Sequence, residues 1–240
     1  DEEVFWLLVA AVVHDLKHPG HGNMWEVKHD SAVARRYAYE SVLENQSIDQ
    51  ALELLRVPAC RFTDGMPLAA RERGRELLRT LVLATDFSHH GEYVAALNTA
   101  VHRRIGEPDY PRAAFASALL PAMLKAADIG NTTKPFPQAV FWADRAMREI
   151  WAELHGDAPL AWTPQQRQTH LCRAQIDFVE RNALGLFSLL GEVDRDVQGL
   201  VRTLHDNLLK YQAAAFCRPL RDPLLGDEQR PPLSPIATPA

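Results

Sequence analysis

The amino-acid sequence predicts an all-α fold, a compact bundle of about eight to ten helices in one domain. Apolar residues recur at three- and four-residue spacing through most of the chain, whereas the alternating pattern of strands is nearly absent. With 240 residues, 47% of them hydrophobic, the chain is long enough to bury the core of one large domain. We therefore expect a helical bundle rather than a sheet protein.

The first predicted helix covers residues 5–16, a nearly continuous apolar run that Pro19-Gly20 brings to an end. Its apolar side chains leave little room for a polar face, so we expect it to be buried. Three further helices are predicted in the first half of the chain, over residues 31–41, 47–57 and 68–88.

The second half contains longer amphipathic segments with the same periodicity. A glycine stop at Gly156 ends one of them. The predicted helices cover residues 112–130, 136–156, 164–191 and 193–216. We place the domain at residues 1–217 and expect the proline-rich, aperiodic residues 218–240 to form a flexible tail.

Composition excludes several classes of function. A net charge of −5 argues against a nucleic-acid partner bound through a basic surface. The longest apolar run has nine residues where a membrane span needs about 20, and the acidic start is unlike a signal peptide. Three scattered cysteines without a CxxC pair favour a reducing compartment. We therefore expect a cytoplasmic protein with no membrane segment.

His14 and Asp15 stand side by side at the end of the first apolar helix. They are either two satisfied polar residues at a helix end or part of a metal site. An imidazole nitrogen and a carboxylate suit zinc, and the carboxylate also suits magnesium or manganese. His18, four residues after His14, shares its face if the helix continues that far.

Other polar residues also follow apolar helical runs. Asp128 ends such a run, where the helix dipole disfavours a carboxylate. Glu44 stands among apolar neighbours and one helical turn after Glu40, and Thr85 follows another apolar run. Each of these residues alone is as consistent with local hydrogen bonding as with a functional site.

Seven segments, in order along the chain, resemble the catalytic domain of the class I cyclic nucleotide phosphodiesterases. They are HDLKHPGHGN, ESVLEN, LVLATDFSHH, KAADIGNTTKP, FWADRAMREIWAELHGD, AQIDF and TLHDNLLKYQ. The resemblance covers roughly residues 4–215 and is specific as a combination. It implies an all-helical domain, in agreement with the periodicity.

The resemblance also implies roles for individual residues. A zinc ion and a magnesium or manganese ion would be held by His14, Asp15 and Asp128, with Asp15 bridging the two ions. His18 and Glu44 would orient these ligands and Thr85 would support the same group. The purine would be bound by Gln175 and Phe178, through its edge and its face, beside Asn131. Without the resemblance, Gln175 and Phe178 at i, i+3 spacing are more simply read as core packing.

The sequence departs from the family at several points. No His-Asn-x-x-His motif, which supplies the family's general acid and a fourth zinc ligand, occurs in the 240 residues. We therefore expect an N-terminally truncated domain that is inactive or nearly so by itself, since loss of a general acid alone removes about 10²–10⁴-fold in rate. Ala146 replaces a larger aliphatic residue that clamps the base, and Lys125 replaces a frequent histidine.

The predicted function is metal-dependent hydrolysis of a small 3′,5′-cyclic nucleotide, cAMP or cGMP, to the 5′-monophosphate. Two alternatives remain. A catalytically dead homologue acting as a regulatory or dimerising module, for example as a homodimer, would explain the missing motif and Ala146. A different metal-dependent phosphohydrolase on a helical HD scaffold would have no need of Gln175 and Phe178.

Overall fold

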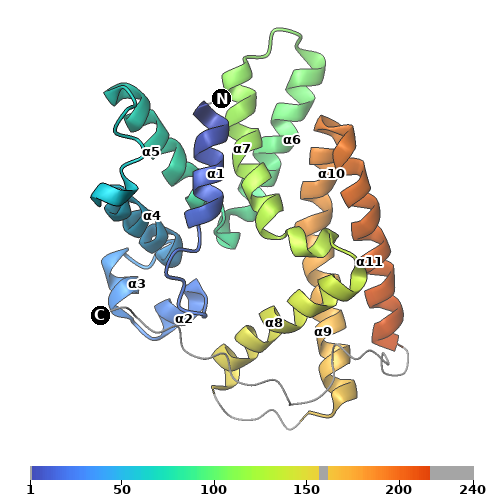
Figure 1. Cartoon of the computed structure of the whole chain (residues 1–240). Coiled ribbons are helices and arrows are strands. Elements are labelled where there is room, and N and C mark those ends of the chain that lie inside the picture. The colour runs from blue at the N-terminus through green and yellow to red at the C-terminus, as the bar shows by residue number, and fades with distance from the viewer. Residues whose placement is uncertain (1, 157–161, 217–240) are drawn as a thin grey trace.

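The computed structural model describes residues 2–156 and 162–216, and it confirms the all-α prediction: these residues form helices and no strand. Figure 1 shows the arrangement. The α-helices are α1 (Glu2–Val13), α2 (Asn23–Lys28), α3 (Ala32–Arg36), α4 (Val42–Leu54), α5 (Leu68–Leu83), α6 (His90–Gly106), α7 (Arg112–Asp128), α8 (Phe136–His155), α9 (Pro164–Phe178), α10 (Leu184–Val193) and α11 (Gln198–Phe216).

Short helical turns join the longer elements. Four of them are 3₁₀ turns: η1 (Pro58–Cys60), η2 (Phe87–His89), η3 (Gly130–Thr133) and η5 (Arg195–Val197). The fifth, η4 (Val179–Ala183), is a π-helical turn between α9 and α10. The expected tail at residues 218–240 lies outside the described residues.

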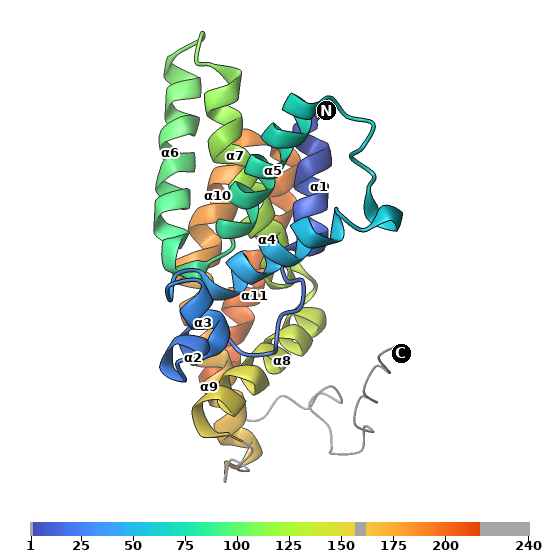
Figure 2. The ribbon, with the colours of Figure 1, turned by 90° about the vertical axis from the view of Figure 1, so that its left-hand side faces the viewer.

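Helix α7 lies at the centre of the fold, because two hydrophobic clusters meet on it. One cluster joins α7 to α1, α4 and α5, and Leu120 and Leu124 are its contribution from α7. The other joins α7 to α6, α10 and α11 through Phe115 and Ala122. In Figures 1 and 2, α7 runs between α1 and α6 in both views. The end of α7 at Asp128 is therefore held from both sides.

Helix α1 is fixed to α5 by one close contact. Trp6 is fully buried, and its indole lies directly over Gly74 in the middle of α5. A Cβ atom at Gly74 would stand 1.9 Å from Cε2 of Trp6, so only glycine leaves room for the ring. This contact sets the position of α1, whose C-terminal end leads into His14 and Asp15.

Several predicted helix boundaries are wrong, and the backbone shows why. The first helix ends at Val13 rather than residue 16, and Lys17 has a left-handed φ of 62°. The helix predicted over residues 31–41 stops at Arg36, because Ala38 and Tyr39 also have positive φ angles, of 53° and 65°. The helix predicted over 47–57 begins earlier, at Val42.

Two further differences concern longer segments. Helix α6 is not among the predicted elements, although it has 17 residues. The helix predicted over residues 164–191 is divided by the π turn η4 into α9 and α10. The helices predicted to begin at residues 68, 112, 136 and 164 do begin there.

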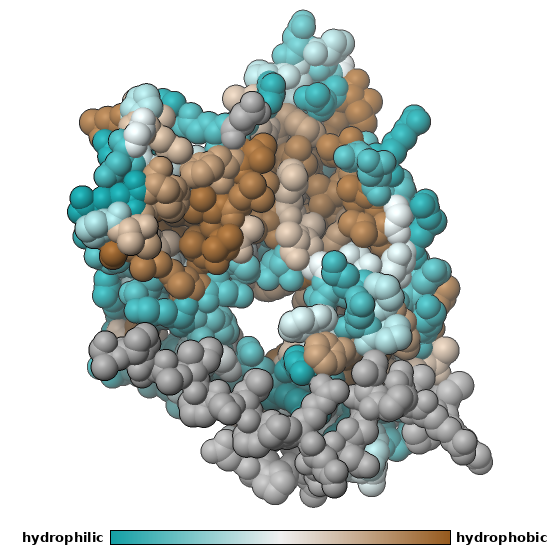
Figure 3. Space-filling model, viewed as in Figure 1, coloured by the Kyte–Doolittle hydropathy of each residue, from teal (hydrophilic) through white to brown (hydrophobic). Residues whose placement is uncertain are grey.

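Part of the apolar surface is exposed. Leu8 and Val12 on α1 and Met123 on α7 have exposed side chains. Figure 3 shows hydrophobic residues over this side of the molecule, next to a hollow. None of the described helices combines the length and the apolar character needed to cross a membrane.

Candidate metal centre and adjoining cavity

His14, Asp15 and Asp128 come together at the ends of two packed helices. Helix α1 stops one residue before His14, and α7 ends at Asp128. His14 Nε2 lies 3.4 Å from Asp15 Oδ2 and 3.4 Å from Asp128 Oδ1. One ligand atom from each of the three residues falls within 4.8 Å of the others. Residues 113 positions apart in the sequence thus form one cluster.

The electrostatics of this cluster favour a cation. His14 Nδ1 lies 3.0 Å from the carbonyl oxygen of Ala11, so a proton on Nδ1 is donated there and Nε2 faces the carboxylates. Hydrogen bonding to Asp128, with the charge of Asp15 adding to it and burial opposing it, raises the pKa of His14 to about 9. One imidazole nitrogen and two carboxylates are a donor set that fits zinc, and the carboxylates fit magnesium or manganese.

Glu44 is held beside this cluster by Asn23. The Asn23 side-chain amide donates to Glu44 Oε2 at 2.9 Å, and its carbonyl oxygen accepts from the Leu43 backbone N–H at 2.9 Å. Burial raises the pKa of Glu44, and the hydrogen bond from Asn23 opposes that rise. Asn23 was part of the motif that we noted, but its role in fixing Glu44 was not predicted.

Thr85 and Asp86 follow the C-terminal end of α5. Thr85 is buried, and its hydroxyl donates to the Val82 carbonyl oxygen at 2.7 Å. Asp86 accepts hydrogen bonds from the Ser88 backbone N–H at 2.8 Å and from the Ser41 hydroxyl at 2.7 Å. Burial alone would raise the pKa of Asp86, but these hydrogen bonds outweigh it and lower the pKa. Asp86 thereby links the end of α5 to the start of α4.

The turn after Asp128 is anchored to α11. Asn207, 1% exposed, donates from its amide nitrogen to the carbonyl oxygens of Thr132 at 2.9 Å and Lys134 at 2.8 Å. Asn131 belongs to the same turn, η3, one residue before Thr132. Apart from its place in a helical motif, no pattern in the sequence marks Asn207.

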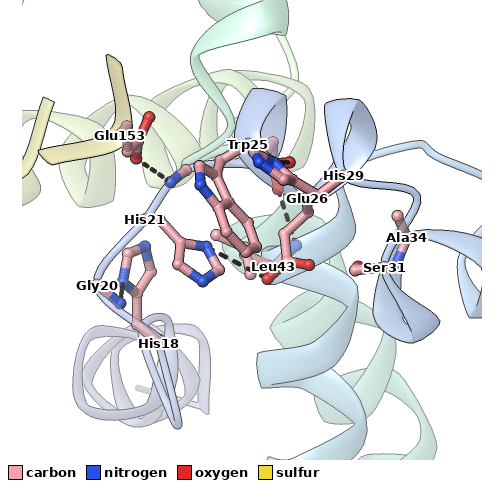
Figure 4. A network of polar contacts seen from close by, with 12 residues as sticks. His18, Gly20, His21, Trp25, Glu26, His29, Ser31, Ala34, Leu43 and Glu153 are labelled. Carbon is pink, nitrogen blue, oxygen red and sulfur yellow. Dashed lines mark hydrogen bonds and ion pairs between the residues drawn. The ribbon is translucent and has the colours of Figure 1, made fainter. Parts of the chain in front are cut away.

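Three aromatic side chains stack where the loop after Asp15 enters α2: His21 in the loop, Trp25 in the helix and His29 at its end, as shown in Figure 4. The Trp25 ring lies between His21 and His29, with ring centroids 3.8 Å and 4.0 Å apart. His21 Nδ1 lies 3.3 Å from a carboxylate oxygen of the buried Glu26. The Gly22 N–H donates to Glu153 on α8, so this loop is tied to a distant helix.

A cavity of about 1390 Å³ opens beside the cluster. Asp128 lies in its wall. Six other predicted site residues also line it: Asp15, His18, Glu44, Thr85, Asn131 and Ala146. His18 reaches the cavity from a turn, since α1 does not continue to it, and its Nδ1 accepts from the Gly20 N–H at 3.2 Å. Glu40 lies before α4, so the helical pairing of Glu40 with Glu44 was wrong.

Gln175 and Phe178 are not among the residues that line the cavity. Gln175 is buried on α9, and Phe178 packs against the core cluster that joins α6, α7, α10 and α11. The ring of Phe178 lies 5.7 Å from that of Phe87, which does line the cavity. The roles of Gln175 and Phe178 toward a purine therefore stay predictions.

Two basic side chains in the cavity wall were not singled out from the sequence. Lys134 and Arg145 line the cavity and are exposed, as is Trp142 next to Arg145. Both basic residues belong to segments that resemble the family, but their position in the cavity wall was not predicted. They place positive charge in a cavity that also holds several carboxylates.

Comparison with known proteins gives consistent relatives. A 3′,5′-cyclic-AMP phosphodiesterase 4C of Mus musculus is 28% identical over 91% of this chain and 33% of the relative. A high affinity cGMP-specific 3′,5′-cyclic phosphodiesterase 9A of Drosophila melanogaster is 30% identical over 84% of this chain and 13% of the relative. The chain thus spans a third or less of the length of these two relatives.

Solved structures agree on the fold. The phosphodiesterase domain of a rhodopsin phosphodiesterase from Salpingoeca rosetta is 26% identical, with a TM-score of 0.76 over 89% of this chain and 67% of that one. A second structure, of the phosphodiesterase domain of the RhoPDE fusion protein from the same organism, is 24% identical with a TM-score of 0.77, covering 89% of this chain and 69% of the other. The 3′5′-cyclic nucleotide phosphodiesterase family profile matches residues 1–204. On this match, which covers most of the sequence, the chain belongs to the 3′,5′-cyclic nucleotide phosphodiesterase family.

Proposed function

We propose that this chain forms the metal-binding core of a phosphodiesterase that hydrolyses cAMP or cGMP to the 5′-monophosphate. The observation that carries the proposal is the cluster of His14, Asp15 and Asp128 at a cavity large enough for a nucleotide. Membership of the family supports the reaction class. The two named relatives act on different cyclic nucleotides, so the proposal leaves the base open.

In this proposal His14, Asp15 and Asp128 hold two divalent ions, zinc and magnesium or manganese. Bound ions supply positive charge that stabilises the anionic transition state and lowers the pKa of water. The chain's own contribution is to hold the ligands in place. Glu44, fixed by Asn23, and His18 present polar atoms to the same cavity. Thr85 supports them from the end of α5.

The nucleotide base occupies the other end of the cavity in this proposal. Asn131, held by the Asn207 anchor, presents an amide there, and Ala146 leaves a loose slot beside it. Phe178 backs this region through its contact with Phe87, and Gln175 lies one helical turn before Phe178. Asn131 leans toward adenine, but an amide can present either a donor or an acceptor.

We also propose that the 240-residue chain by itself does not hydrolyse cyclic nucleotides. Its cluster has three protein ligands, and its sequence contains no His-Asn-x-x-His motif to supply a general acid. A missing general acid removes about 10²–10⁴-fold in rate. Metal binding and nucleotide binding do not need the general acid, so the site is tested through them.

The test measures Mn²⁺ binding by isothermal titration calorimetry and hydrolysis of cAMP, cGMP and 5′-AMP by the same preparation. We expect Mn²⁺ binding that His14→Ala and Asp128→Asn each weaken at least tenfold. Glu92→Gln, an exposed carboxylate on α6, serves as the matched control and leaves binding unchanged. Equal binding in all four proteins would refute the metal site.

The hydrolysis measurements separate the alternatives. We expect no hydrolysis by the chain alone and hydrolysis of a cyclic nucleotide once a segment with the His-Asn-x-x-His motif is added in cis. Turnover by the chain alone would refute the proposed inactivity. Hydrolysis of 5′-AMP in preference to cAMP and cGMP would favour another phosphohydrolase. Persistent inactivity of the extended protein, with a dimer in light scattering, would favour a regulatory module.

A further inference from the structure

Lys125 is a buried basic residue behind the wall of the site. It lies on α7 one turn before Asp128 and is 3% exposed. Its ammonium group donates hydrogen bonds to the backbone carbonyl oxygens of Ala84 at 2.5 Å and Asp86 at 3.3 Å. These two residues flank Thr85, so the ammonium group holds the chain on both sides of a residue in the cavity wall.

The position of these carbonyl groups explains why a cation is favourable there. Helix α5 ends at Leu83 with Ala84 as its C-cap residue, so the Ala84 carbonyl group has no partner within the helix, whereas the Asp86 carbonyl group lies beyond it at the start of η2. The carbonyl groups at a helix C-terminus also carry the negative end of the helix dipole, which a positive charge stabilises. Lys125 therefore acts as a cap for α5 that comes from a different helix.

Carboxylates and aromatic rings surround this ammonium group. Burial lowers the pKa of Lys125, and the negative charges of Asp128, Asp86 and Glu44 oppose that fall. The rings of Phe87 and Tyr93 face the ammonium group at 5.0 Å and 5.7 Å from their centroids. A buried cation persists only with such compensation, and here the compensating carboxylates belong to the candidate metal centre and its supports.

We propose that Lys125 is a positioning residue: it caps α5 from α7 and thereby fixes Thr85 in the cavity wall beside the metal cluster. The inference rests on the proposed function only where it concerns metal binding, because the cap itself is a property of the fold. This capping role also gives a reason for lysine at a position where histidine is frequent in the family.

Three accounts of Lys125 predict different results, and two of them predict opposite effects on metal affinity. If Lys125 acted only through its charge, its removal would strengthen Mn²⁺ binding, because a like charge beside the carboxylates would be lost. If it positions Thr85, its removal weakens Mn²⁺ binding. If Lys125 merely filled the core, its removal would lower the stability of the fold without a specific change in the hydrogen exchange of residues 84–88.

The experiment compares Lys125→Met, Thr85→Val and the double variant with the original chain. Lys134→Met is the matched control, because Lys134 lines the same cavity but is exposed. The measurements are the midpoint of thermal unfolding, hydrogen exchange of residues 84–88, and Mn²⁺ affinity by calorimetry. We expect Lys125→Met to speed hydrogen exchange of residues 84–88 at least tenfold and to weaken Mn²⁺ binding about fivefold. We expect Lys134→Met neither to speed this exchange nor to weaken Mn²⁺ binding.

The double variant tests whether the two residues act together. We expect it to bind Mn²⁺ no more weakly than the poorer single variant, since both substitutions remove the same support. Unchanged exchange, tighter Mn²⁺ binding or fully additive losses would each overturn the proposal. If Lys125→Met does not fold, Lys125→Gln, which keeps an N–H donor, decides by the same exchange measurement. If the original chain binds no Mn²⁺, the proposed function fails, and the exchange data still decide whether Lys125 caps α5.

Discussion

Substitution of Gly74 by alanine should separate α1 from α5 and destabilise the whole fold. The added Cβ would stand 1.9 Å from Trp6 Cε2, whereas carbon atoms pack at about 3.5–4.0 Å. The ring or the helix must therefore move by about 1.6–2.1 Å. Both partners are held rigidly, because Trp6 is fully buried and the new atom belongs to the backbone of a 16-residue helix.

The magnitude follows from two opposing contributions. Displacing a buried aromatic side chain costs up to about 3–5 kcal/mol, the range for large-to-small core substitutions. Alanine in a helix interior recovers about 1 kcal/mol relative to glycine. We therefore expect the free energy of unfolding to fall by about 2–4 kcal/mol, measured by urea denaturation with tryptophan fluorescence and circular dichroism.

Two companion variants make this prediction specific. Gly91→Ala on α6 meets nothing within 4 Å and should leave stability unchanged or raise it by up to about 1 kcal/mol. Trp6→Phe should recover part of the loss when combined with Gly74→Ala, because the smaller ring leaves room for the methyl group. A loss below about 0.5 kcal/mol in Gly74→Ala, or strict additivity with Trp6→Phe, would refute the reasoning.

Three further predictions concern single buried or capping groups. Asn207→Asp sets a carboxylate against the carbonyl oxygens of Thr132 and Lys134, and we expect it to cost about 3 kcal/mol or more in urea denaturation; a loss below about 1 kcal/mol would contradict the anchor. Burial raises the pKa of Cys172 from 9.0 to about 11, so its contribution to stability is present below pH 9 and lost as pH rises toward 11. Alkylation followed by mass spectrometry at pH 8 should label Cys60 and spare Cys172, and equal labelling would show that Cys172 is accessible. Thr163→Ala removes the capping box of α9 and should cost about 1 kcal/mol, with faster hydrogen exchange limited to the first turn of that helix.

The fold class followed from periodicity, but several boundaries did not. The start of α9 is written in the sequence, since Thr163, Pro164 and Gln166 form a capping box with proline in the first turn. The end of α3 is not, because Ala38 and Tyr39 adopt left-handed angles that their residue types disfavour. The Tyr39 N–H donates to the Ala34 carbonyl oxygen at 2.8 Å, the 6→1 hydrogen bond of a helix C-cap in which Ala38 takes the left-handed place usually held by glycine. Without a glycine there, the residue types give no signal of this helix end.

The candidate site also contains residues that the sequence predicts and residues that it does not. His14, Asp15 and Asp128 were predicted because each belongs to a distinctive motif, and the structure brings them together. Their supports come from residues without a local signature: Asn207 acts on a turn 73 to 75 residues away. Lys125 was noticed only as a replacement for histidine, since its two carbonyl partners lie about 40 residues away, across a helix pair.

The π turn between α9 and α10 sets the angular phase of two helices that the sequence presents as one. A π-helical turn holds one residue more than the α-helical spacing allows. The same residues wound as a regular α-helix would turn α10 by about 100° against α9, the rotation of one residue. Phe187 and Leu190, which now line the cavity, would then leave its wall while Gln175 stayed in place. The wider turn thus accommodates one additional residue and keeps Phe187 and Leu190 directed toward the cavity, where regular α-helical spacing of the same chain would direct them elsewhere.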